Sequence, residues 1–232
     1  MALETRQRPH ADAERRHVED EEFAAGDTRV EAYSLGRILA ISDGVFAFAL
    51  TLLVVQLAVP AAGSGGSLGS RLADLYPAYF SYGLSFAAIA LTWTGHHETF
   101  KYIRHVDGHL ISLNFGWLLL IALLPFPTAV LGRFGHDLVA AILYAVVMSL
   151  TGLASTATWW YATSGRRLVN PNLSDQLVRS RYLTTLSVPV VFLSSIPIAL
   201  WRPELAELAW TVFWLLYFIA LRRPLQRMAR GR

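Results

Sequence analysis

The stretch GRILAISDGVFAFALTLL, residues 36–53, decides the fold of this chain. It begins as a polar helix start and continues as an apolar run, with Arg37 and Asp43 carried into its first turns. An ionisable side chain at the centre of a bilayer costs roughly 3 kcal/mol on insertion scales, so such groups persist where a function or a buried partner needs them. We therefore look first to this helix for functional residues.

The composition sets the class of protein. Of 232 residues, 54% are hydrophobic and only 16% are charged, and several apolar runs approach the ~20 residues that span a bilayer as a helix. An open sheet edge cannot be left in lipid, which excludes lone strands. There is no cysteine, which excludes disulfides, thiolate metal sites and cysteine nucleophiles. We expect an all-α integral membrane protein.

The chain divides into six expected spans between two charged tails. Residues 1–34 carry five arginines and nine acidic residues and predict a disordered cytosolic tail without a signal peptide. Residues 35–223 form the predicted transmembrane domain, and residues 224–232 a basic cytosolic tail. We expect prolines 189 and 197 to break the fifth span. The spans are predicted at about 36–59, 75–101, 108–131, 137–163, 181–200 and 204–221.

The arginines predict the topology. The odd-numbered connections hold Arg71, Arg133 and Arg202, one each, out of 20 lysines and arginines in the chain. The others lie in the tails, in the even-numbered connections and at the start of the first span. Basic residues mark the cytoplasmic side of short loops, so both termini are predicted to be cytosolic. Because the basic residues lie at the span ends, membrane topology explains the net charge of +3 better than nucleic-acid binding does.

One face of the first span has a heptad-like pattern. At 100° per residue, Ser42 and Asp43 fall on the far side, toward the rest of the subunit. A 4, 3, 4, 3, 4 spacing is typical of a seam that meets identical helices around an axis, although ordinary helix packing also produces it. The residues of this seam are Arg37, Ile41, Gly44, Phe48, Thr51 and Val55, with Leu52 beside them.

Other polar side chains lie at a similar depth and are candidate partners for Ser42 and Asp43. A structural hydrogen-bond cluster is one interpretation, because a buried carboxylate needs donors. A metal site with His96, His97 and Glu98 is the alternative, but adjacent histidines point about 100° apart and the HExxH spacing is missing. We predict no resident metal and no cofactor. The candidate partners are Trp93, His96, His97, His109 and Asn114.

The ordered motifs resemble one family of channels. Arg37-x-x-x-Ile41-Ser42-Asp43 is similar to the RxxxFSD signature of the transmembrane protein 175 family of potassium channels. The resemblance continues through Trp93-x-x-His96-His97, Arg104-x-Val106-Asp107, Asn114 and the segment LLPFPT at 123–128, and so covers the first three spans in order. Bacterial members look like single six-helix repeats that assemble as tetramers, and this chain resembles that type.

The resemblance implies a cation channel without a Thr-Val-Gly-Tyr-Gly filter, and that segment is absent here. The first helices of four copies would line a central pore, with the constriction at Phe48 and further pore-facing positions at Thr51, Leu52 and Val55. Arg37, Ser42 and Asp43 would hold the helices through hydrogen bonds to the histidines of the second span and to Asn114. Two departures from the family pattern are Ile41, where the signature has phenylalanine, and Phe48, where a branched aliphatic residue is usual.

The resulting prediction is a potassium-permeable channel, not an enzyme, that conducts passively as a homotetramer in a bacterial inner membrane. Its partners would be other copies of itself, membrane lipid and monovalent cations, with potassium only transiently in the pore. The alternative is a proton-coupled secondary transporter that uses Asp43 and His96 or His97 as a relay. That alternative predicts inverted repeats or helices broken at mid-membrane, and the sequence shows no convincing halves.

Overall fold

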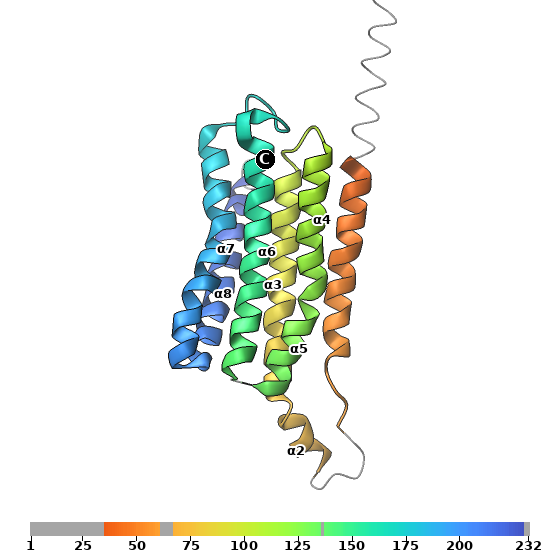
Figure 1. Ribbon diagram of the computed structural model, residues 1–232, viewed down its shortest axis with the longest axis vertical. Helices are drawn as coiled ribbons and strands as arrows, with labels where there is room; N and C mark the ends of the chain where they lie inside the picture. Colours follow the sequence, from red (N-terminus) through yellow and green to blue (C-terminus); the bar gives the residue numbers. More distant parts are fainter. Residues whose placement is uncertain (1–34, 61–66, 136, 230–232) are drawn as a thin grey trace, which may run out of the picture.

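The computed structural model describes residues 35–60, 67–135 and 137–229. Long helices run side by side in a bundle, with the first helix at one edge and α7 and α8 at the other (Figure 1). A single isolated antiparallel bridge, between Ile103 and Val169, is the β pairing among the described residues. In chain order the elements are the first helix Leu35–Val55, α2 Leu68–Ala73, α3 Tyr76–Phe100, α4 Gly108–Leu123, α5 Pro125–Phe134, α6 Leu138–Thr163, η1 Ser164–Arg166, α7 Asp175–Trp201 and α8 Pro203–Ala229.

Short polar side chains fix where three of these helices begin. Asp107 accepts a hydrogen bond from the backbone N–H of Leu110 at 2.8 Å and so caps α4. Asp137 caps α6 in the same way. Ser174 accepts from the N–H of Leu177, so α7 begins at Asp175, six residues before the fifth span was predicted to begin. Each cap satisfies N–H groups that the first helical turn leaves unpaired.

Two predicted spans end or divide differently from the expectation. The first helix ends at Val55 and not near residue 59, because the N–H groups of Gln56 and Leu57 bond three residues back, in the tighter pattern of a helix end. The third span divides into α4 and α5 at Leu124. Pro125 has no N–H to continue the α4 ladder, and Pro125 and Pro127 instead begin a new helix.

The expected break of the fifth span at its prolines is wrong, because α7 continues through both Pro189 and Pro197. A proline inside a membrane helix is tolerated when neighbouring helices compensate for the lost hydrogen bond. Here α6 supplies a close neighbour at Gly152, where an added Cβ would lie 2.5 Å from Cδ of Pro189. The missing side chain of Gly152 lets α6 and α7 pack tightly around the proline ring.

Four segments of the described chain are long and apolar enough to cross a membrane. They are Leu35–Val55, Gly108–Phe134, Leu138–Arg166 and Asp175–Trp201. α3 and α8, with 25 and 27 residues, have a spanning length but contain more polar and amphipathic residues. The backbone of α8 continues to Ala229, into the segment predicted as the basic tail. The predicted tail at 1–34 lies outside the described residues.

The core of the bundle is aromatic between α6, α7 and α8. The rings of Tyr144, Phe192 and Trp210 lie within 6.2 Å of one another, centroid to centroid, and all three are fully buried. The first helix is packed far less completely. In its most apolar window 22% of residues are buried, against 56% for the segment that contains α6. A large part of this apolar helix is therefore uncovered in the single chain.

Candidate functional site: the two faces of the first helix

One face of the first helix packs into the subunit. Its four residues follow one another at intervals of four, three and four, and each is at most 1% exposed. The face combines one hydroxyl with three apolar side chains, so its polar group has to find a partner in the protein. The four residues are Ser42, Phe46, Ala49 and Leu53.

Ser42 is part of a hydrogen-bonded chain that crosses three helices. The side-chain amide of Asn114, on α4, donates to Oγ of Ser42 at 3.1 Å. Nε2 of His96, on α3, lies 2.9 Å from Oδ1 of Asn114. That amide oxygen can only accept, so Nε2 carries the hydrogen. The Ser42 hydroxyl then donates to the carbonyl oxygen of Ile38 at 2.8 Å. We call Ser42, Asn114 and His96 the buried triad.

Aromatic rings enclose the imidazole of the buried triad. The His96 ring stacks on Phe100 with centroids 4.4 Å apart and lies 4.9 Å from the ring of Trp117. Phe46 of the first helix meets the same imidazole edge-to-face at 5.4 Å. Because His96 is only 1% exposed and held by rings on three helices, its contacts position the first helix against α3 and α4.

Asp43 has a partner different from those the resemblance implied. Nε1 of Trp93 donates to Oδ1 of Asp43 at 2.8 Å. Among the described residues, neither histidine of α3 forms a hydrogen bond with the Asp43 carboxylate. His97 is exposed and faces Trp93 at a ring distance of 6.0 Å. Arg37 lies near the start of the same helix and is exposed, outside the buried triad.

The metal alternative has no support in the described part of the chain. His96 and His97 follow each other on α3, but one is buried in the triad and the other is exposed. Glu98 lies 3.9 Å from the ammonium group of Lys101. Within the described residues no group of three or more histidines, cysteines or acidic residues is arranged to hold a metal ion.

The opposite face of the first helix is exposed along its length. The side chain of Phe48 is 63% exposed, that of Val55 is 72% and that of Ile41 is 47%. Thr51 is exposed and donates its hydroxyl back to the carbonyl oxygen of Phe48 at 2.8 Å, while Leu52 is half-buried at the edge. We call the exposed residues the outer seam: Ile41, Gly44, Phe48, Thr51 and Val55.

A second polar cluster was not predicted as a site. Oγ of Ser85, on α3, lies 2.7 Å from Oγ1 of Thr128 on α5 and 3.0 Å from the hydroxyl oxygen of Tyr144 on α6. Thr128 ends the LLPFPT segment, but the sequence had no spacing that would pair it with Ser85 and Tyr144. This cluster connects α3, α5 and α6.

Asp107 has a further partner beyond its cap. The hydroxyl of Tyr161, at the end of α6, donates to Oδ2 of Asp107 at 2.6 Å. Desolvation acts to raise the pKa of this carboxyl, but the hydrogen bonds from Tyr161 and from the N–H of Leu110 outweigh it and lower the pKa. The carboxylate therefore stays charged at neutral pH and connects the α3–α4 loop to α6.

The apolar helical bundle, with a buried polar triad behind a long exposed apolar seam, defines a multi-pass membrane protein. Comparison with known proteins gives its family. A family described as "Endosomal/lysosomal potassium channel TMEM175" matches residues 37–125. A potassium channel of Streptomyces collinus is 38% identical over 149 residues, which cover 62% of this chain and 72% of that protein. A potassium channel of Chamaesiphon minutus is 35% identical over 144 residues, 60% and 71% of the two chains.

A solved structure extends the likeness to most of the chain. The crystal structure of a lysosomal potassium-selective channel TMEM175 homolog from Chamaesiphon minutus matches with a TM-score of 0.71 and 30% identity. The match covers 82% of this chain and 98% of that one. The chain belongs to the TMEM175 family of potassium channels. The resemblance based on the sequence motifs is confirmed.

Proposed function

We propose that this protein conducts potassium passively through a central pore formed by four copies, each with six membrane spans and both termini in the cytosol of a bacterial cell. The observation that carries the proposal is the outer seam. A mainly apolar strip that repeats every three and four residues along one helix is exposed in the single chain, and no described part of the subunit covers it. Two bacterial relatives are potassium channels, which supports potassium as the ion.

The assembly follows from the geometry of the seam. A 3–4 repeat keeps one helix face turned toward identical helices around a common axis. Gly44 lies in the middle of the seam, and a Cβ added there would meet no atom within 4 Å in the single chain. Another helix can therefore approach the backbone at this position. A symmetric assembly buries the seam of every copy in the same way.

Phe48 is the proposed constriction. Its ring is the largest side chain of the outer seam and points away from the subunit core, with 63% of its surface exposed. Four such rings around an axis would form an apolar ring that excludes water, and hydrophobic constrictions gate ion flow by dewetting. Thr51 lies one turn further along with its hydroxyl engaged by the helix backbone, so the pore lining there is weakly polar.

The buried triad positions the pore helix and does not contact the ion. Ser42, Asn114 and His96 are each at most 1% exposed and face away from the seam. The proton-relay alternative gains nothing from the described contacts. Asp43 accepts a hydrogen bond from Trp93, and His96 is bonded to Asn114, so among the described residues no hydrogen bond joins Asp43 to His96 or to His97.

Potassium flux into liposomes containing the purified protein tests the proposal. Phe48→Ala removes the constriction, so we expect at least a several-fold higher flux that follows the imposed potential. Phe115→Ala is the matched control: this ring is 50% exposed on α4, away from the seam, and its loss leaves the flux unchanged. A flux that Phe48→Ala leaves at the wild-type value would rule out Phe48 as the gate, and no flux in any variant would refute the channel.

A further inference from the structure

A groove lies at the end of the bundle where the described chain begins. Its volume is about 790 Å³. Leu35 and Leu39 of the first helix form one wall, and the end of α3 with the following loop forms the other. Residues 169–171, from the connection between α6 and α7, close it. We call this the terminal groove.

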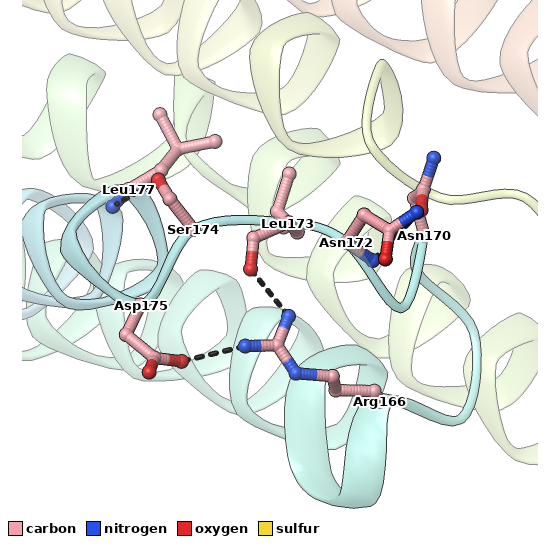
Figure 2. Close-up of polar contacts among 7 residues, drawn as sticks. All are labelled: Arg166, Asn170, Asn172, Leu173, Ser174, Asp175 and Leu177. Carbon is pink, nitrogen blue, oxygen red and sulfur yellow. Dashed lines mark hydrogen bonds and ion pairs between the residues drawn. The ribbon is translucent and has the colours of Figure 1, made fainter.

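Backbone contacts hold the walls of the terminal groove together. The N–H of Arg104 donates to the carbonyl oxygen of Leu168 at 2.7 Å, and Ile103 forms the isolated bridge with Val169. The connection that carries Val169 is itself fixed. Figure 2 shows the guanidinium of Arg166 donating to the carbonyl oxygen of Leu173 and to Asp175, the latter at 2.6 Å. The groove is therefore a preformed part of the fold.

The terminal groove is basic at its rim and apolar at its base. Lys101 and Arg104 are exposed, and none of the described residues that line the groove is acidic. The guanidinium of Arg104 has no hydrogen bond or ion pair with the described residues. Among the described residues, the ammonium group of Lys101 has one ion-pair partner, Glu98, at 3.9 Å. Phe100 and Ile103 are buried below these cations, so the groove suits a ligand with carboxylates beside apolar side chains.

The chain itself contains a segment of that chemistry. Residues 17–23, HVEDEEF, place four consecutive carboxylates between Val18 and Phe23. Twelve residues separate Glu22 from Leu35, and Leu35 lines the groove. A linker of that length with random-coil statistics would have a root-mean-square span of about 20 Å, enough to reach any part of the groove. The tether also makes docking intramolecular, with an effective concentration in the millimolar range.

We propose that the acidic segment 17–23 docks into the terminal groove of its own chain, with its carboxylates on Lys101 and Arg104. The tail is favoured over an anionic lipid because it is attached at the edge of the groove and combines the required charge with an apolar side chain at each end. The docked tail restrains the start of the first helix. The docking itself does not depend on the proposed function. An effect of this restraint on the pore does rest on the proposed function.

Disulfide trapping tests the docking in the full-length protein, because the chain has no cysteine of its own. The pair Ala24→Cys and Asn172→Cys places one thiol beside the acidic segment and one next to the groove residue Pro171. We expect rapid formation of a disulfide within one chain under mild oxidation in neutral lipid nanodiscs. The pair Ala24→Cys and Gly69→Cys is the distance control, because α2 lies at the opposite end of the bundle (Figure 1).

Charge variants decide whether the groove and the acidic segment recognise each other. Exposed ion pairs are worth up to ~1 kcal/mol each, so the double variant Lys101→Gln with Arg104→Gln should slow disulfide trapping roughly ten-fold. Replacement of residues 19–22 by glutamine, or 1 M salt, should slow it to the same extent. Arg179→Gln removes an exposed cation outside the groove and should leave the rate unchanged. Lys101→Glu with Arg104→Glu should recover the rate when residues 19–22 are lysine.

Several results would overturn the proposal. The first is a trapping rate that neither set of charge variants changes. The second is disulfide formation only between two chains, and the third is loss of trapping in nanodiscs that contain phosphatidylglycerol. The last result, with weaker phosphatidylglycerol retention by the Lys101 and Arg104 variant, would assign the groove to anionic lipid. Disulfide formation is measured independently of ion flux. A failure of the docking proposal can therefore be distinguished from a failure of the proposed channel function.

Discussion

Phe46 and Phe48 are two residues apart on the same helix and have opposite surroundings. Phe46 is 1% exposed and meets the imidazole of His96, whereas Phe48 is 63% exposed and has no ring contact among the described residues. The same side chain thus contributes to the subunit core at one position and remains available for assembly at the other. The first helix therefore has one packed and one exposed face, and the hydroxyl of Ser42 lies on the packed face.

Replacing each phenylalanine by alanine separates the two roles most strongly. Phe46→Ala leaves a cavity beside His96, so we expect a loss of about 3–5 kcal/mol in the free energy of unfolding of the subunit. Phe48→Ala removes an exposed ring and should change that free energy by no more than about 0.5 kcal/mol. Denaturant titration in a detergent that separates the subunits measures both. Equal losses would contradict the assignment of the two faces.

Asn114 tests the buried triad. Asn114→Leu keeps the volume of the side chain but removes the partner of Ser42 and of the His96 N–H, and a buried group without a partner costs about 1–3 kcal/mol. We expect a loss in that range by the same titration, with little further loss when Ser42→Ala is added. Phe115→Leu, at the next position of α4, is the exposed control and should be silent. Additive losses from Asn114→Leu and Ser42→Ala would show that the two residues act independently.

Gly44 tests the outer seam with the smallest effect on the subunit. A Cβ at this position meets no atom within 4 Å in the single chain, so Gly44→Leu should leave the unfolding free energy of the separated subunit within about 0.5 kcal/mol of wild type. If copies pack along the seam, the leucine side chain obstructs them and lowers the fraction of assembled protein. Mass measurement in mild detergent reads this fraction. A wild-type mass distribution would place the contact between copies elsewhere.

The sequence determined the membrane class, the family and the two faces of the first helix. Hydropathy and length decide that an apolar run must be helical in lipid, because every backbone polar group has to be satisfied within the segment. The order and spacing of the motifs indicated the TMEM175 family. The arrangement of Ser42 opposite Phe48 follows from the helical rotation of 100° per residue, which any helix obeys.

The tertiary structure decided the partners. The sequence placed Trp93, His96, His97 and Asn114 at one depth. Only the packing of the first helix against α3 and α4 pairs Trp93 with Asp43, and Asn114 with both Ser42 and His96. The close packing of α6 on α7 at Pro189 depends on Gly152, a contact between residues far apart in the chain. The walls of the terminal groove likewise come together through a contact between distant residues, the bond from Arg104 to Leu168. Local rules fix the faces of a helix, whereas contacts between distant residues depend on how all the helices pack.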